Sequence, residues 1–354
     1  MRYTLFGESH GPAIGIVLQD VPSGLVLDMD FINAEMARRA PGASPLATSR
    51  READAVEIQS GVFEGRTTGT PLCALIRNTD ARSRDYESAR WLPRPGHADF
   101  TGHLRYKGFE DYRGGGHFSG RLTAPLVFAG AVAKLALRER GIEVLARIRQ
   151  IERVEDAPLD LASPDLAALR EAGKKPFPVI DDECGTAMQE AILRARAEGD
   201  SVGGVIECFV LGLPAGVGGP DFDENLEGLF ARHVFAVPAV KGIVFGAGFG
   251  LAAMRGSQAN DAFIPGPGGL PRTRTNHSGG ISGGIANGMP LVFRVAVKPT
   301  PSIAQEQDTV DMRTGEAARL AVSGRHDPCI VPRAVSVIEA AAALAMSEVP
   351  GVPA

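Results

Sequence analysis

The sequence predicts an α+β protein in which helices and strands pack as layers. Segments with apolar residues at three- and four-residue spacing, typical of helices, are interleaved with short runs of Val, Ile and Phe, typical of buried strands. Their order is mixed and does not alternate strictly between strand and helix. This favours an α+β or layered sandwich fold over a doubly wound sheet. The chain has 354 residues, 44% of them hydrophobic, so it can bury a large core.

The helical and strand segments are predicted as follows. Helical periodicity is clearest over residues 29–40, 120–140, 184–199, 224–235 and 332–347. The second of these helices ends at Gly141, a residue type that commonly terminates helices. The best strands are Ala13–Leu18, Leu72–Arg77, Gly204–Val210, Val240–Phe245 and Leu291–Lys298.

Glycine and proline are concentrated in several loops and do not form one linker. These loops cover residues 113–120, 213–220, 246–250, 264–271 and 278–288. Residues 153–182, rich in Ala, Asp, Pro and Lys, are predicted to be a surface excursion and not a domain boundary. The sequence has no repeat of fixed period. We therefore expect residues 1–354 to form one domain.

Charge and cysteine content argue against several classes of protein. The chain carries 37 Lys and Arg against 42 Asp and Glu, so its net charge of −5 gives no general attraction for nucleic acid or an anionic membrane. Its four cysteines are scattered without a C-x-x-C pair, so we expect neither disulfides nor a bound metal. The N-terminus lacks a signal-peptide pattern, and no stretch approaches the ~20 apolar residues that span a bilayer. These features predict a cytoplasmic protein.

Two histidines lie in short loops suited to proton transfer. His10 stands in GESHG (7–11), just before a predicted strand, and its small neighbours would let a planar ligand approach. His97 stands in RPGHAD (94–99), beside a cation and a carboxylate. A pKa near neutrality suits histidine for general acid–base catalysis. Taken alone, each loop is also typical of an ordinary hydrogen-bonded or ion-paired turn.

A third loop, DYRGGGHFSGR (111–121), has the properties of an anion cradle. Its three glycines leave backbone N–H groups accessible, Ser119 can cap the helix that follows, and a helix N-terminus favours negative charge. The pattern matches neither the P-loop nor the dinucleotide-binding fingerprint. A flexible loop without a ligand is the alternative.

Three further loops have compositions that suit a cofactor or a phosphate. TNHSGGISGG (275–284) alternates small residues and glycine, as close contact with a flat cofactor requires. KPTPS (298–302) offers an ammonium group and hydroxyls to a phosphate. GRHDP (324–328) places three ionisable residues in a row, which would need partners if buried. Each is also compatible with a plain turn, but the six loops together indicate a site for a polyanion and a cofactor.

In this order and at these distances, the sequences FGESHG, RPGHAD, DYRGGG, NHSGGISGGI, VKPTPSI and GRHDPC resemble the signature set of the chorismate synthase family. The match runs from residue 5 to about residue 346. The resemblance implies a sandwich of helices between antiparallel sheets, usually in a homotetramer. It also implies an anti 1,4-elimination of phosphate from 5-enolpyruvylshikimate 3-phosphate to give chorismate. Reduced FMN is the implied cofactor, with NADPH or a separate flavin reductase as the source of electrons.

The resemblance assigns roles to individual residues. His10 and His97 match the family's active-site histidines, and Asp327 matches its aspartate beside the flavin. Arg39 matches an arginine assigned to nicotinamide-nucleotide or substrate phosphate contact, and we expect Arg121 to bind substrate anions as well. The flavin-contacting positions correspond to Ser119, Ala239, Gly283, Lys298, Pro299, Thr300, Pro301, Ser302 and Arg325.

The chain departs from the family pattern at several positions. Pro45 stands where many members have a second arginine, which argues against NADPH binding. His117 and Phe118 stand where many have Arg and Ser, and Pro238 with Ala239 where a polar and a small residue are common.

The implied reaction needs proton transfers, because a weakly acidic C–H proton and an allylic phosphate must both leave. We expect His97 to protonate the departing phosphate, His10 to stabilise the anionic reduced flavin, and Asp327 to assist proton removal at flavin N5. A diverged flavin-binding reductase with another substrate is the alternative enzyme. A phosphosugar- or RNA-binding module is the non-catalytic alternative, although the single tryptophan, Trp91, leaves little for base stacking.

Overall fold

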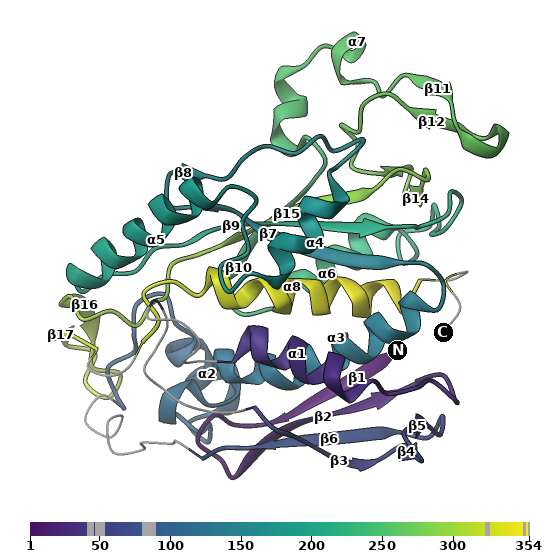
Figure 1. Cartoon of the computed structure of the whole chain (residues 1–354). Coiled ribbons are helices and arrows are strands. Elements are labelled where there is room, and N and C mark those ends of the chain that lie inside the picture. The colour runs from purple at the N-terminus through teal and green to yellow at the C-terminus, as the bar shows by residue number, and fades with distance from the viewer. Residues whose placement is uncertain (41–45, 47–53, 80–89, 323–325, 350–351, 353–354) are drawn as a thin grey trace.

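Two antiparallel sheets enclose a layer of helices (Figure 1). The computed structural model describes residues 1–40, 46, 54–79, 90–322, 326–349 and 352. The first sheet has the order β1-β2-β6-β3, with β1 at Arg2–Gly7, β2 at Ala13–Gln19, β3 at Val56–Ser60 and β6 at Leu72–Arg77. The second has the order β10-β15-β9-β7-β8, with β7 at Glu143–Ile151, β8 at Val154–Glu155, β9 at Gly204–Leu211, β10 at Val240–Phe245 and β15 at Leu291–Val297. This confirms the predicted β-α-β sandwich.

The enclosed layer contains α1 (Met29–Arg39), α3 (Thr123–Arg138), α6 (Leu226–Phe235) and α8 (Val331–Met346). Helix α3 packs on β2 and β6 of the first sheet, while α8 packs on β7 and β9 of the second. The two helices also pack on each other, and they approach closely because Gly130 of α3 faces Ala340 of α8. Small residues at this crossing therefore hold the two halves of the sandwich together.

Strand alternation explains which residues face the helical layer. In β2, Ile14, Ile16 and Leu18 are fully buried against it. In β9, Cys208 faces the same layer, whereas Phe209 faces outward and packs in a second cluster with Leu169. Leu169 belongs to α4 (Leu166–Lys174), which packs on β7, while α5 (Asp182–Ala197) packs on β7 and the edge strand β8. The stretch predicted as a surface excursion thus contains both a helix and the edge strand β8.

The apolar segment Gly120–Arg138 is long and apolar enough to cross a membrane by length and composition, contrary to the expectation that no stretch approaches this limit. However, 94% of the qualifying window is buried inside the fold. That burial is typical of a core helix, and the segment here is α3 with the 3-10 turn η3 (Gly120–Leu122) before it.

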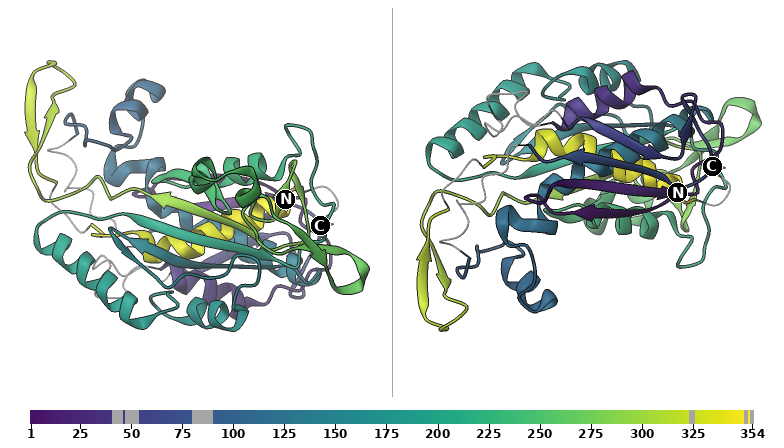
Figure 2. Two further views of the ribbon diagram at one scale, coloured as in Figure 1. Left: turned by 90° about the horizontal axis from the view of Figure 1, so that it is seen from above. Right: turned by 90° about the horizontal axis from the view of Figure 1, so that it is seen from below.

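The smaller elements gather at the two ends of the sandwich. Helix α2 (Asp99–Tyr106), the 3-10 turn η2 (Arg113–Phe118) and the hairpin β16–β17 (Gln307–Val310, Ala317–Leu320) lie towards one end (Figures 1 and 2). The opposite end carries the hairpins β11–β12 (Phe263–Pro265, Pro271–Thr273) and β13–β14 (Ile281–Ser282, Ile285–Ala286). The remaining short elements are β4 (Val62–Phe63), β5 (Arg66–Thr67), α7 (Gly256–Ala259), η4 (Gly248–Ala253) and η5 (Pro267–Gly269).

Candidate active site

The three glycines at 114–116 bring the two predicted catalytic histidines together. All three have positive φ, at 63°, 104° and 54°. A Cβ added at Gly114 would lie 2.1 Å from Cε1 of His10, and one at Gly115 would lie 3.2 Å from Nε2 of His97. The histidines therefore rest against successive glycines of one loop, and side chains at these positions would compete with them for space.

His10 is held in place by the residue before it. It follows β1 and is buried, with 7% of the residue exposed. Ser9 Oγ lies 3.1 Å from His10 Nδ1 and donates to the Arg113 carbonyl at 3.3 Å. The Ser9 amide donates to the Gly116 carbonyl at 3.1 Å. These contacts tie the His10 loop to the triple glycine.

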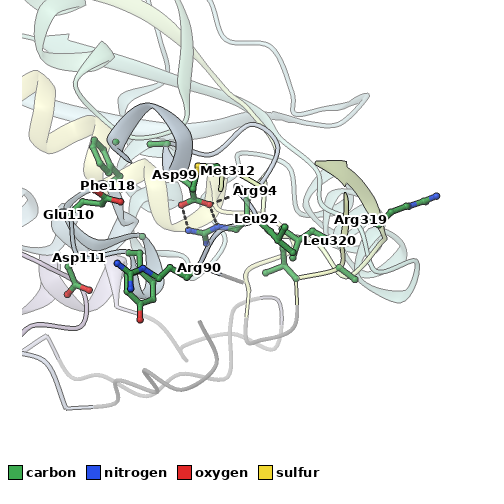
Figure 3. Close-up of a pocket in the computed structure, with 16 residues that line it drawn as sticks. Arg90, Leu92, Arg94, Asp99, Glu110, Asp111, Phe118, Met312, Arg319 and Leu320 are labelled. Carbon is green, nitrogen blue, oxygen red and sulfur yellow. Dashed lines mark hydrogen bonds and ion pairs between the residues drawn. The ribbon is translucent and has the colours of Figure 1, made fainter. Parts of the chain in front are cut away.

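His97 is bonded within its own loop to an ion pair. Its Nδ1 lies 2.5 Å from Asp99 Oδ1. Arg94 donates to the same carboxylate from Nε and from Nη2, each at 2.7 Å (Figure 3). Burial alone would raise the pKa of Asp99, but the hydrogen bonds from Arg94 and His97 hold that pKa well below its usual range. Asp99 is therefore an anion at neutral pH.

A cavity of about 270 Å³ opens beside this ion pair (Figure 3). Arg94, Asp99 and Gly115 form part of its wall. The wall also includes apolar and aromatic side chains, namely Leu92, Phe118, Met312, Leu320 and Val322. Charged side chains, among them Arg90, Glu110 and Arg319, share the lining with these apolar groups, a combination found in small-molecule sites.

The segment Lys298–Ser302 leaves the end of β15 and contacts the His97 loop. The Lys298 ammonium group donates to the Gly96 carbonyl, and Arg94 Nη1 donates to Ser302 Oγ at 3.2 Å. Pro301 also lies close to Gly96. The segment predicted to contact a flavin therefore lies beside one of the predicted catalytic histidines.

Ala239 and Asp327 are bonded to the same segment. The Ala239 carbonyl accepts from the Lys298 amide at 3.0 Å, and Thr300 Oγ1 donates to the Asp327 carbonyl at 2.7 Å. The Asp327 carboxylate is paired with Arg333 of α8 at 2.6 Å. These predicted site residues thus form one connected group with the Lys298–Ser302 segment.

Arg39 and Arg121 converge on Asp54. Arg39 Nη1 lies 2.6 Å from Asp54 Oδ2, and Arg121 Nη1 contacts Oδ1; all three side chains are almost fully buried. Burial by itself would raise the pKa of Asp54, but the two arginines lower it. Burial and the nearby Arg333 lower the pKa of Arg39 to about 10, which leaves it a cation at neutral pH. The two predicted substrate ligands are therefore neighbours that share one carboxylate.

The structure places two of the remaining predicted flavin-contacting positions, Ser119 and Gly283, far from each other. Ser119 Oγ accepts from the Arg121 amide at 3.2 Å and caps η3, directly before α3. Gly283 lies in the turn of β13–β14, at the opposite end of the protein from α2 (Figures 1 and 2), so the structure does not bring it together with the other predicted positions. Arg325 lies outside the described residues.

Three residues of this arrangement, Asp54, Asn78 and Arg333, are not among the positions that the sequence predicts. Asn78 donates to the carbonyls of Glu8 and Gly11 and accepts from Arg121 Nε at 3.1 Å. Arg333 could have been predicted to have an acidic partner, because a cation in the first turn of a helix is unfavourable for the helix dipole unless it is paired. Asp54 and Asn78 belong to no local motif, so only the tertiary structure reveals their role.

The chain is similar to chorismate synthases over nearly its whole length. A family profile described as chorismate synthase matches residues 1–349. A chorismate synthase of Aeropyrum pernix is 48% identical over 347 residues, covering 98% of this chain and 90% of that protein. One of Dehalococcoides mccartyi is 46% identical over 359 residues, covering 98% and 94%. A crystal structure of chorismate synthase matches with a TM-score of 0.76 and 30% identity, covering 97% of this chain and 89% of that chain.

Proposed function

The chain belongs to the chorismate synthase family, and from this premise we propose that the loops around His10 and His97 are its catalytic site. The reaction eliminates phosphate from 5-enolpyruvylshikimate 3-phosphate and leaves chorismate. The observation that carries the proposal is the placement of the two histidines against Gly114 and Gly115. Two groups able to transfer protons are thereby held at one loop, as an elimination that moves a proton and a phosphate requires.

The charges around the histidines suit a substrate with phosphate and carboxylate groups. Four carboxylates of this region, those of Asp54, Asp99, Asp111 and Asp327, pair with arginines. Six cations lie among them, namely Arg39, Arg94, Arg113, Arg121, Lys298 and Arg333. The excess of positive charge favours a polyanion, since hydrogen bonds between charged partners are stronger than neutral ones.

The donor groups of Lys298–Ser302 fit FMN, the cofactor that the family implies. The Lys298 ammonium group and the Ser302 hydroxyl, which accepts from Arg94, can donate to phosphate oxygens, whereas the Thr300 hydroxyl donates to the Asp327 carbonyl. Ala239 adjoins this segment. We propose that this segment, with Ser119, holds the cofactor, and that Gly283 and Arg325 contact it as the resemblance predicts. When bound, reduced FMN supplies an electron transiently to the allylic system, so the reaction has no net redox change.

The protein side chains would then bind the substrate and move protons. His97 donates a proton to the leaving phosphate, and His10 holds a proton beside the reduced cofactor. Asp327 assists proton removal later in the cycle. Arg39 and Arg121 bind the anionic groups of the substrate, and both guanidinium groups are paired with Asp54.

Anaerobic phosphate release from 5-enolpyruvylshikimate 3-phosphate tests this function. We expect release with photoreduced FMN and none with oxidised FMN. Tight flavin binding without any release would contradict the proposal and favour the flavin reductase left open by the sequence, which would instead oxidise NAD(P)H without this substrate. The comparisons give that alternative no support.

The source of electrons, the number of copies in the assembly and the location in the cell are proposed separately. We propose that a separate reductase or NADPH itself reduces the flavin, that four copies assemble, and that the enzyme works in the cytoplasm. Pro45, the position that argues against NADPH, lies outside the described residues. Light scattering of the purified protein measures the number of copies. NADPH oxidation under anaerobic conditions, with and without an added reductase, decides the electron source.

A further inference from the structure

We propose that Asp99, clamped by Arg94, is a positioning residue that fixes the tautomer and orientation of the His97 ring. The inference deepens the proposed function, because His97 is a proton donor only under that function. The geometry of the three side chains is independent of it.

The contacts of His97 Nδ1 decide where the ring proton lies. Asp99 Oδ1 is 2.5 Å away and Arg94 Nη2 is 3.2 Å away. A carboxylate only accepts hydrogen bonds, and a guanidinium only donates them. An unprotonated Nδ1 would place its lone pair directly against the anionic oxygen at the shorter distance. Because the contact with this acceptor-only oxygen is shorter than the contact with Arg94 Nη2, Nδ1 carries the proton and donates it to Asp99 Oδ1.

This tautomer determines what the other ring nitrogen can do. Nε2 and Cε1 of His97 both lie 3.2 Å from the position of a Gly115 Cβ, so this edge of the ring faces the triple-glycine loop. His10 rests against the preceding glycine of the same loop. With the proton fixed on Nδ1, Nε2 is the nitrogen that takes up and releases protons on this side.

The carboxylate of Asp99 is itself held from several directions. Its Oδ2 accepts from the Arg94 amide at 3.0 Å and from Arg94 Nε at 2.7 Å, while its Oδ1 faces His97 and Arg94 Nη2. Arg94 Nη1 is anchored in turn to Ser302 Oγ. Both oxygens of Asp99 are therefore fixed in position, so the carboxylate can hold the imidazole in one orientation.

The substitution Asp99→Asn tests the proposal because an amide has one end that accepts and one end that donates hydrogen bonds. The donors around it decide which end faces His97. Two Arg94 donors meet at the Oδ2 position and one at the Oδ1 position. The amide oxygen therefore occupies the former, which turns the amide NH₂ towards His97 Nδ1. An NH₂ group there can only donate, so the ring proton moves to Nε2.

The experiment combines ring ¹⁵N NMR with steady-state kinetics. We expect the parent protein, at a pH where the imidazole is neutral, to show a protonated Nδ1 and an unprotonated Nε2 for His97, assigned with His97→Ala. Asp99→Asn should show the reverse and lose at least about 10²-fold in kcat, with KM unchanged. The matched control is Asp311→Asn. It alters an equivalent Asp–Arg pair, with Arg313 at 2.6 Å, and should keep the parental tautomer and kcat.

The NMR and kinetic results test the role of Asp99 separately from the proposed function. A parent spectrum with the proton on Nε2 overturns the proposal without any variant, as does an Asp99→Asn protein that keeps both the parental tautomer and kcat. If the parent releases no phosphate with reduced FMN, the proposed function fails. The tautomer reversal would then still establish Asp99 as the residue that positions His97.

Discussion

Replacing Gly114 with alanine should displace His10 and disable the enzyme without unfolding it. A Cβ at this position would lie 2.1 Å from Cε1 of the imidazole, whereas ordinary contact begins at 3.4 Å. The ring would therefore have to retreat by about 1.3 Å. Because misplacement of a reacting group by about 1 Å can cost about 10²-fold in rate, we expect kcat to fall by at least that factor.

The cost to folding should be modest and can be separated from the effect on catalysis. The φ of Gly114 is 63°, and a residue with a Cβ in this left-handed region loses about 1–2 kcal/mol. Gly65→Ala is the matched control, since Gly65 has φ of 73° and no atom within 4 Å of its added Cβ. Gly65→Ala should lose only this backbone contribution in urea unfolding and keep parental phosphate release, whereas Gly114→Ala should lose about 1–3 kcal/mol more because of the clash with His10. Parental kcat in Gly114→Ala would refute the described packing of His10.

Three further predictions concern the buried helical layer. Glu339→Gln should lower the free energy of unfolding by about 3–5 kcal/mol, since Arg38 and Lys134, at 2.6 and 2.5 Å, would lose a buried counter-ion; an unchanged urea midpoint would contradict this. Burial alone would raise the pKa of Glu339, but these cations lower it from 4.5 to about 2. Its contribution is therefore present above about pH 4.5 and lost as pH falls towards 2, so the stability gap between parent and Glu339→Gln should narrow over this range. Gly130→Ala should cost about 1–3 kcal/mol, because its Cβ would lie 2.2 Å from that of Ala340; a parental melting temperature would argue against this helix crossing.

The sequence predicted long periodic elements better than short or charged ones. All five predicted helices and all five predicted strands are present with small shifts of their ends. Strand β7 was missed because Arg147 interrupts its apolar pattern. This arginine is nevertheless fully buried, paired with Glu207 at 2.7 Å and with Asp156 at 2.6 Å. The pair with Glu207 joins residues 60 positions apart in the chain, so no local pattern reveals it.

The candidate site shows the same limit. The motifs identified the histidine loops and the triple glycine, because glycine conformation and motif order are local properties. They could not show that Gly114 and Gly115 each support one histidine, nor that Asp54 links Arg39 to Arg121. Both facts depend on segments that meet only after folding.

Single-turnover phosphate release by His10→Ala and His97→Ala, with reduced FMN under anaerobic conditions, tests the central claim most directly. If the two histidines carry the proton transfers, each variant should lose about 10²–10⁴-fold in rate while binding FMN as tightly as the parent. Near-parental release by either variant would contradict the role assigned to that histidine.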